Sequence, residues 1–139
     1  MTQPIIRLNP PTMPNSRDMG YSQISIVEPG RMAYVSGQVA WTPDGTPAPD
    51  SLAEQTRLAA ANAQAALDAL AATPEDIVML RCFMTDLTDD ALAEAFPPLL
   101  EFLDGAEPCI TGVGVAALAG ADLKIELELT VRVPDGSLP

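Results

Sequence analysis

The sequence predicts an α+β domain in which a mixed sheet carries two helices on one face. Residues 20–27 and 124–133 alternate polar and apolar side chains, which is the period of a half-buried strand. Ser51 and Glu54 form a capping box at the start of an alanine-rich stretch, which predicts a helix over residues 51–72. In chain order the elements are β-β-α-β-α-β-β, an arrangement typical of folds whose helices pack on one face of a sheet.

The amino-terminal part is predicted to contain a β-hairpin behind an extended segment. Four prolines disfavour regular structure over residues 1–18, which we expect to be extended. Residues 20–27 and 32–40 are the two expected strands, and the Pro-Gly turn at residues 28–31 would join them. Turn-forming residues predict a loop over 43–50.

The carboxy-terminal part is predicted to alternate strands with a second helix. The nearly continuous apolar run at residues 77–85 is typical of an interior strand. Thr88 is the expected cap of a helix over residues 89–103, which Pro97 and Pro98 should kink or split. Two more strands are expected, at residues 112–118 and 124–133. The chain has no internal repeat or linker, so residues 1–139 are expected to form one domain.

The composition argues against several classes of function. The 139 residues include 7 Lys and Arg against 19 Asp and Glu, a formal charge of −12 that disfavours nucleic acid as a partner. Histidine is absent, which removes the commonest metal ligand and general base. Two cysteines without a CxxC pattern indicate a reducing compartment. No apolar run reaches about 18 residues, so we expect a cytoplasmic protein without a membrane partner.

The last predicted strand separates polar from apolar side chains completely. Its apolar face should meet the helices, and its polar face requires either water or a partner subunit. The polar side chains are Lys124, Glu126, Glu128, Thr130 and Arg132. Lys124 is the expected partner of Glu126, whereas Arg17 and Arg132 are expected to form surface salt bridges.

Several short segments, in register, resemble the RidA/YjgF family, whose members also carry the name endoribonuclease L-PSP. The segments are Gly20-Tyr21-Ser22-Gln23, Val35-Ser36-Gly37-Gln38, Thr42-Pro43-Asp44-Gly45, Glu75-Asp76-Ile77-Val78, Thr85-Asp86-Leu87, Val113-Gly114-Val115-Ala116 and Ile125-Glu126-Leu127-Glu128. The resemblance implies a chorismate-mutase-like fold assembled as a homotrimer, with ligand clefts between subunits. It also implies hydrolysis of enamines and imines to 2-keto acids and ammonia, a reaction that needs neither metal nor cofactor.

The resemblance implies particular site residues as well. Glu126 matches the glutamate that orients the attacking water. Tyr21 matches a tyrosine that lines the cleft. Ser36 and Gly37 match a segment where the backbone approaches the ligand, and Gly37 suits such an approach because it lacks a Cβ. Backbone N–H groups near Gly112 are candidate donors to the substrate.

Two positions depart from the family's deaminases. Ile110 stands where they place an arginine, two residues after a proline, that clamps the substrate carboxylate. Glu94 stands where they often carry asparagine. Both changes disfavour anion binding and argue against 2-iminopropanoate as the substrate.

Two functions therefore remain open. The first is a RidA-like hydrolase of small enamines, imines or related carbonyl compounds, with water oriented by Glu126. The second is a non-catalytic trimer that binds a small metabolite in its inter-subunit clefts. Ribonuclease activity is a poorer reading because of the acidic balance and the missing histidine.

Overall fold

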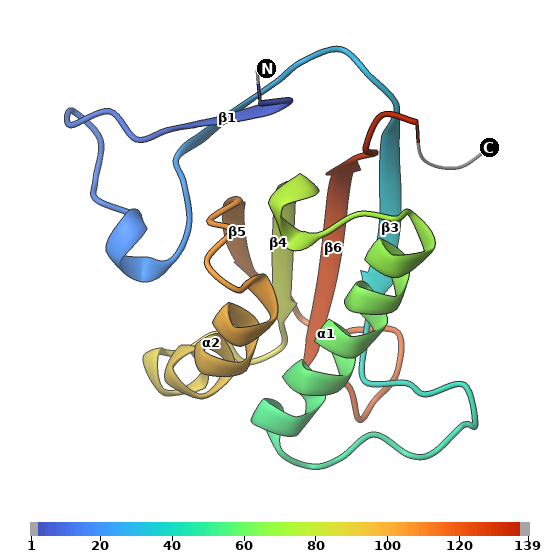
Figure 1. Ribbon diagram of the computed structural model, residues 1–139. Coiled ribbons are helices and arrows are strands. Elements are labelled where there is room, and N and C mark those ends of the chain that lie inside the picture. Colours follow the sequence, from blue (N-terminus) through green and yellow to red (C-terminus); the bar gives the residue numbers. More distant parts are fainter. Residues whose placement is uncertain (1–2, 137–139) are drawn as a thin grey trace.

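A four-stranded mixed sheet forms the centre of the protein. The computed structural model describes residues 3–136 (Figure 1). The strands are β3 (Met32–Gln38), β4 (Ile77–Met84), β5 (Cys109–Gly114) and β6 (Ile125–Arg132). They lie in the order β3-β6-β4-β5, and only β4 and β5 run parallel. The predicted α+β class is confirmed, although β5 begins three residues before the predicted 112–118.

Two helices cover one face of this sheet (Figure 1). In α1 (Leu52–Ala69), Ser51 accepts a 3.0 Å hydrogen bond from the backbone N–H of Glu54. In α2 (Asp89–Leu103), Thr88 accepts one of 3.1 Å from Ala91. Both predicted caps are confirmed, because each hydroxyl satisfies an N–H that has no partner within its own helix.

Helix α2 continues through both prolines, so the predicted split is wrong. Pro97 and Pro98 cannot donate hydrogen bonds to the carbonyls of Ala93 and Glu94, four residues earlier. Both of these residues are exposed, so water can donate hydrogen bonds to their carbonyls instead. Pro98 itself is buried against the rest of the protein, which helps to keep the helix in place.

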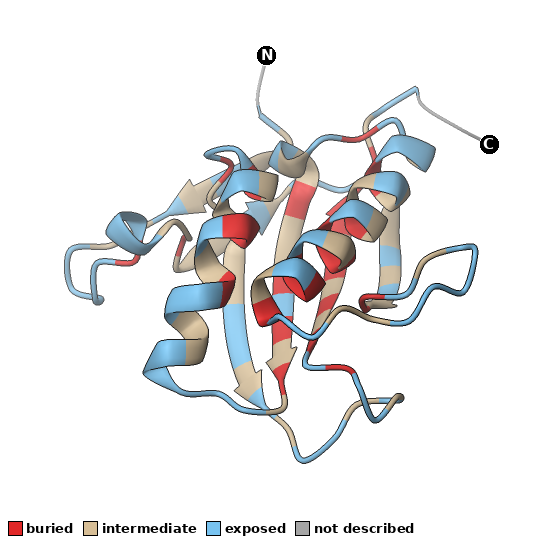
Figure 2. Ribbon diagram, turned by 90° about the horizontal axis from the view of Figure 1, so that it is seen from below, coloured by how far each residue is buried: buried red, intermediate tan, exposed pale blue. Residues whose placement is uncertain are grey.

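The core lies between the helices and the sheet, where Figure 2 shows the buried residues. Strand β6 contributes every second side chain to it: Ile125, Leu127, Leu129 and Val131. Helix α1 adds mainly alanines together with Leu67, and α2 adds Leu99 and Leu103. The small alanines allow α1 to lie close to β6.

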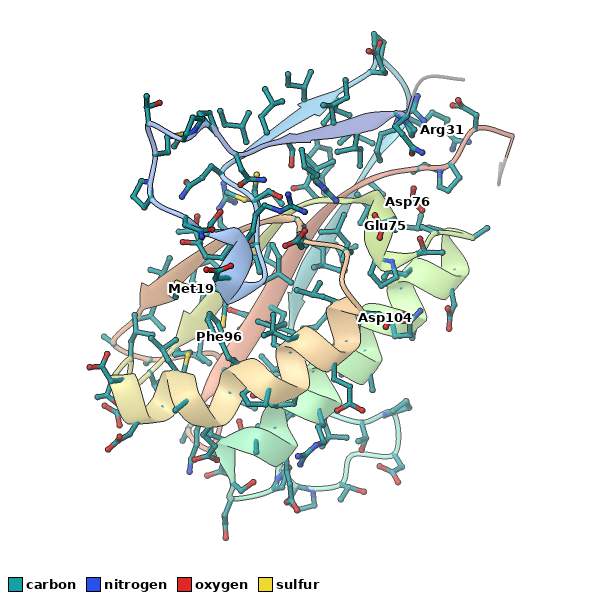
Figure 3. All side chains as sticks on the ribbon, turned by 60° about the vertical axis from the view of Figure 1, so that its left-hand side comes forward. Met19, Arg31, Glu75, Asp76, Phe96 and Asp104 are labelled. Carbon is teal, nitrogen blue, oxygen red and sulfur yellow. The ribbon has the colours of Figure 1, made fainter. Side chains whose placement is uncertain are left out.

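The amino-terminal segment forms a separate two-stranded ribbon. Strand β1 (Ile5–Leu8) pairs antiparallel with β2 (Ile24–Val27). β1 lies within the segment predicted to lack regular structure, whose residues 1 and 2 lie outside the described part. A short 3-10 helix, η1 (Arg17–Met19), follows β1. Figure 3 shows Met19 near Phe96 of α2.

The expected hairpin between residues 20–27 and 32–40 is wrong, because β2 pairs with β1 and β3 pairs with β6. The guanidinium of Arg132 explains why the segment between β2 and β3 does not form a hairpin turn. It donates hydrogen bonds to the carbonyls of Glu28 (3.3 Å) and Pro29 (2.8 Å). A Cβ at Gly30 would collide with this guanidinium. The segment between β2 and β3 therefore wraps a buried cation instead of forming a hairpin turn.

Arg7 fastens the ribbon to the sheet. Its guanidinium donates to Ser25 Oγ (2.9 Å) and to the backbone carbonyls of Glu75 (3.2 Å) and Ile77 (2.8 Å). Partial burial lowers the pKa of Arg7 from its ordinary value. Glu75 and Asp76 belong to the short 3-10 helix η2 (Pro74–Asp76), at the end of the sheet where Figure 3 also places Arg31.

No helix within residues 3–136 is long and apolar enough to cross a membrane.

We expect the stability of the fold to fall between about pH 9 and 11 because of Cys82. Burial raises the pKa of this thiol from 9.0 to about 11. In that interval the unfolded chain has already lost the thiol proton while the folded chain retains it, so rising pH favours unfolding. The full effect is about 2–3 kcal/mol.

Urea unfolding from pH 8 to 11 measures this effect when wild type is compared with Cys82→Ala. The difference in unfolding free energy between the two should change by most of that amount. A pH-independent difference would contradict the assignment to Cys82. The comparison cancels the titration of tyrosine and lysine, which both proteins share.

Candidate functional site

The face of the sheet opposite the helices carries the candidate site. On β6 the side chains of Glu126, Glu128 and Thr130 point to this face, because their neighbours in sequence are buried against the helices. Phe83 of β4 lies in register with Glu126, and Arg81 lies in register with Glu128. No helix within residues 3–136 packs on this face, which we call the open face.

Glu126 lies directly over the backbone of β3. Between the pairs Val35–Leu129 and Gln38–Leu127, two residues of β3 oppose the single residue Glu128, which forms a β-bulge at Ser36 and Gly37. A Cβ at Gly37 would collide with the Glu126 carboxylate, so only glycine permits this approach. The structure thus brings together three predicted site residues: Ser36, Gly37 and Glu126.

The carboxylate of Glu126 forms no hydrogen bond or ion pair with another group in residues 3–136. Lys124, its expected partner, instead donates to the backbone carbonyl of Asp50. That expectation is wrong because Lys124 precedes β6 and lies at the end of the sheet, beside the start of α1. Glu126 is therefore available to a water molecule or a ligand.

Arg81 is a residue of the open face that the sequence analysis missed. Its Nη1 donates to Glu128 Oε1 at 2.7 Å, and the two side chains are 51% and 40% exposed. Together with Tyr34, Ser36 and Thr130 they line a groove of about 390 Å³. The sequence does show a single arginine within the apolar run 77–85, at a position whose side chain alternates away from the core. Its partner Glu128 depends on a strand pairing that the sequence did not reveal.

Three other predicted site residues lie at β5 and the segment beside it, the edge of the sheet farthest from β3. Ile110 pairs with Leu80 and packs against the core, so it lies on the helix side of the sheet. Gly112 is exposed, and a Cβ there would have no atom within 4 Å. Tyr21 precedes Ser22, which forms a β-bridge with Cys109.

The β5 edge and Glu126 are separated within one chain. Strand β4 lies between β5 and β6, and Ile110 is in register with Leu129, so Ile110 and Glu126 stand two strand spacings and three residues apart, about 14 Å, on opposite faces of the sheet. One chain therefore does not bring these two predicted groups into one cleft.

Glu94 binds the start of α1. Its Oε2 accepts a 2.8 Å hydrogen bond from the backbone N–H of Ala53, an interaction that the positive end of the helix dipole favours. Glu94 also lines a cavity of about 710 Å³ beside the first residues of both helices, together with Asp86, Asp90 and Lys124. Its predicted contact with substrate stays a prediction.

Most basic side chains already form ion pairs or hydrogen bonds within the chain. Arg17 forms the expected surface ion pair, at 3.2 Å from Glu107. The expected surface salt bridge of Arg132 is wrong in one respect: its ion pair with exposed Asp135 (3.1 Å) belongs to a buried guanidinium that also binds backbone carbonyls. Cys109 lies 3.2 Å from Ser25 Oγ. No cluster of His, Cys, Asp and Glu in residues 3–136 could hold a metal ion.

The fold and the open face define an α+β protein of the chorismate-mutase-like class, and comparison with known proteins identifies its family. A model of the family described as endoribonuclease L-PSP matches residues 14–133. The Escherichia coli K12 protein named "RutC family protein YjgH" is 36% identical over 110 residues, which is 78% of this chain and 81% of that protein. The chain belongs to the endoribonuclease L-PSP family, which is the RidA/YjgF family that its motifs resemble.

Two solved structures place the chain among the Rid proteins. The Rid-family protein YyfB from Yersinia pestis has a TM-score of 0.88 at 33% identity, with coverage of 94% of this chain and 99% of that one. E. coli TdcF, crystallised with bound serine, has a TM-score of 0.64 at 29% identity, with coverage of 76% and 84%. In K12 its name is "Putative reactive intermediate deaminase TdcF", with 31% identity over 103 residues that are 73% of this chain and 79% of TdcF.

We expect Gly37→Ala to destabilise the protein because its methyl group would collide with Glu126. The loss should be about 1 kcal/mol, the lower end of the range for overpacking, because the Glu126 carboxylate ends a flexible side chain that can shift. Gly112→Ala is the matched control, since it lies in a strand of the same sheet and its added Cβ meets open space.

Urea unfolding of four proteins tests the origin of the loss: wild type, Gly37→Ala, Glu126→Ala and the double variant. Removal of the carboxylate should recover most of the stability lost at Gly37. If the two effects simply add, the proposed collision between Gly37 and Glu126 is wrong.

Proposed function

We propose that the protein hydrolyses imines or enamines of small molecules, with Glu126 as the residue that holds and orients the attacking water. One observation carries this proposal: a carboxylate without a partner in residues 3–136 lies over a glycine bulge on a sheet face that no helix there covers. Family membership and the name of TdcF support the same chemistry. The proposed reaction requires no metal or cofactor.

The chemistry requires few groups. The water oxygen bonds to the imine carbon, the carbon–nitrogen bond breaks, and the products are a carbonyl compound and ammonia. A carboxylate that accepts a hydrogen bond from the water aligns its lone pair with the carbon and takes up its proton, and such a group contributes typically 10²- to 10⁴-fold to the rate. Ser36 and the backbone of Gly37 offer polar groups beside Glu126 for the substrate nitrogen or oxygen.

We also propose that each complete site is formed by two copies of the chain within a homotrimer. The predicted site residues divide between the open face, which carries Ser36, Gly37 and Glu126, and the β5 edge, which carries Tyr21 and Gly112. These groups cannot meet within one chain, but the open face of one copy can meet the β5 edge of the next. A cyclic trimer repeats such a head-to-tail contact three times and closes it.

Glu126→Gln should lower the hydrolysis rate at least about 100-fold, because the amide cannot take up the proton of the attacking water. Release of ammonia from imines that an amine oxidase generates in situ measures the rate. Glu101→Gln, on the exposed side of α2, is the control and should retain wild-type activity. Equal rates for wild type and Glu126→Gln would remove Glu126 from the mechanism.

The same preparations distinguish the second candidate, a non-catalytic trimer that binds a small metabolite. This alternative is favoured by Ile110, which is partly buried against the core and offers no charge to a substrate. A binding protein should show saturable thermal stabilisation by a metabolite and no acceleration of imine hydrolysis.

Mixing two inactive variants tests the shared site. Glu126→Ala removes the open-face carboxylate, whereas Gly112→Phe blocks the β5 edge without a clash at its own Cβ. After mild unfolding and joint refolding, about one contact in four joins an intact open face to an intact edge, so about a quarter of wild-type activity should return. Absence of any recovery in verified mixed trimers would mean that each site lies within one chain.

A further inference from the structure

The charge of the open face indicates which imines the site accepts, an inference that rests on the proposed function. The face carries the carboxylates of Glu126 and Glu128 and the guanidinium of Arg81. Arg81 is bound to Glu128 at 2.7 Å, so Glu126 remains as an uncompensated negative charge. A substrate that reaches Glu126 must therefore approach a net negative surface.

The other basic side chains of the chain do not change this balance. The guanidiniums of Arg7 and Arg132 bind backbone carbonyls away from Glu126. Arg17 lies beside the β5 edge that a second copy would bring to Glu126, but Glu107 compensates its charge at 3.2 Å. Lys124 binds the carbonyl of Asp50. Arg31 also has a partner. Arg57 lies on the exposed side of α1, beside Gln64 and Glu101, with the core between it and the open face.

We propose that the Arg81–Glu128 pair sets the charge class of the substrate, so that the site takes imines without a carboxylate, in their neutral or protonated form. Glu128 occupies the one guanidinium of this face that could otherwise clamp a substrate carboxylate. A protonated imine carries its positive charge next to the carbon that water attacks, and Glu126 can stabilise that charge while it orients the water. A substrate carboxylate would be repelled by the uncompensated charge of Glu126.

The geometry supports this role for the pair. Arg81 and Glu128 are cross-strand neighbours, and Glu126 is the diagonal neighbour of Arg81, about 7–8 Å away between backbones. The pair forms one wall of the groove that Tyr34, Ser36 and Thr130 complete. A substrate at Glu126 therefore lies close enough for its outer substituent to meet the pair. Replacing Glu128 by glutamine would release Arg81 and leave a positive charge at this wall, where the ion pair is neutral.

A matched pair of imines tests the proposal. Benzylamine and phenylglycine differ by one carboxylate, and flavin oxidases convert them in situ to the corresponding imines. Wild type should hydrolyse the benzylamine imine with at least a tenfold higher kcat/KM than the phenylglycine imine. Glu128→Gln should reduce this preference at least tenfold, whereas Glu101→Gln should leave it unchanged. Equal or reversed preference in wild type would overturn the inference while the proposed function stands.

If neither imine is hydrolysed, the proposed function fails, and a binding measurement then tests the charge preference of the site on its own. Serine, which is bound in the TdcF structure, and ethanolamine also differ by one carboxylate. Ethanolamine should raise the melting temperature of the wild type in a saturable manner and serine should not, while Glu128→Gln should gain a response to serine. Stabilisation of wild type by serine to the same extent, or by neither compound, would overturn the inference.

Discussion

The alternation of side chains along β6 is the constraint on which the rest of the structure depends. Its odd-numbered residues from Ile125 to Val131 fill the core, and its even-numbered residues face away from the helices. A slip of one residue in its pairing would place Glu126 and Glu128 in the core and expose four apolar side chains. Core packing therefore fixes the direction of Glu126 without any hydrogen bond to hold the carboxylate.

The neighbours of β6 convert this direction into a site. On one side the bulge in β3 places Gly37 under the Glu126 carboxylate, and on the other side β4 places Arg81 beside Glu128. Bulges commonly occur beside functional sites because they redirect the strand locally. The site thus requires the central position of β6, with β3 and β4 both paired to it.

The parts of this arrangement that depend on local sequence could be predicted. The caps at Ser51 and Thr88 and the two faces of β6 follow from residue types at fixed spacing, and the structure has them as expected. The motifs of the family likewise led to Glu126, Ser36 and Gly37, which the structure brings together on one face. These signals all lie within single elements or short segments of the chain.

The parts that depend on contacts between distant segments could not be predicted. The loss of the expected hairpin follows from a guanidinium that lies more than a hundred residues further along, at Arg132. The position of Ile110 on the helix side follows from its parallel pairing with Leu80. Arg81 appeared to be one polar residue in an apolar strand until its antiparallel pairing placed it opposite Glu128.

Most of the few basic residues in this acidic chain hold parts of the fold together. Backbone carbonyls engage Arg7, Lys124 and Arg132, and these bonds fasten the ribbon, the start of α1 and the segment before β3. The bonds of Arg132 are structural, because loss of this buried cation would leave the carbonyls of Glu28 and Pro29 without donors. With its cations committed to the fold, the chain has little positive charge left for an anionic ligand. The proposed substrate, an imine that is protonated, would itself supply the positive charge that the neighbours of Glu126 lack.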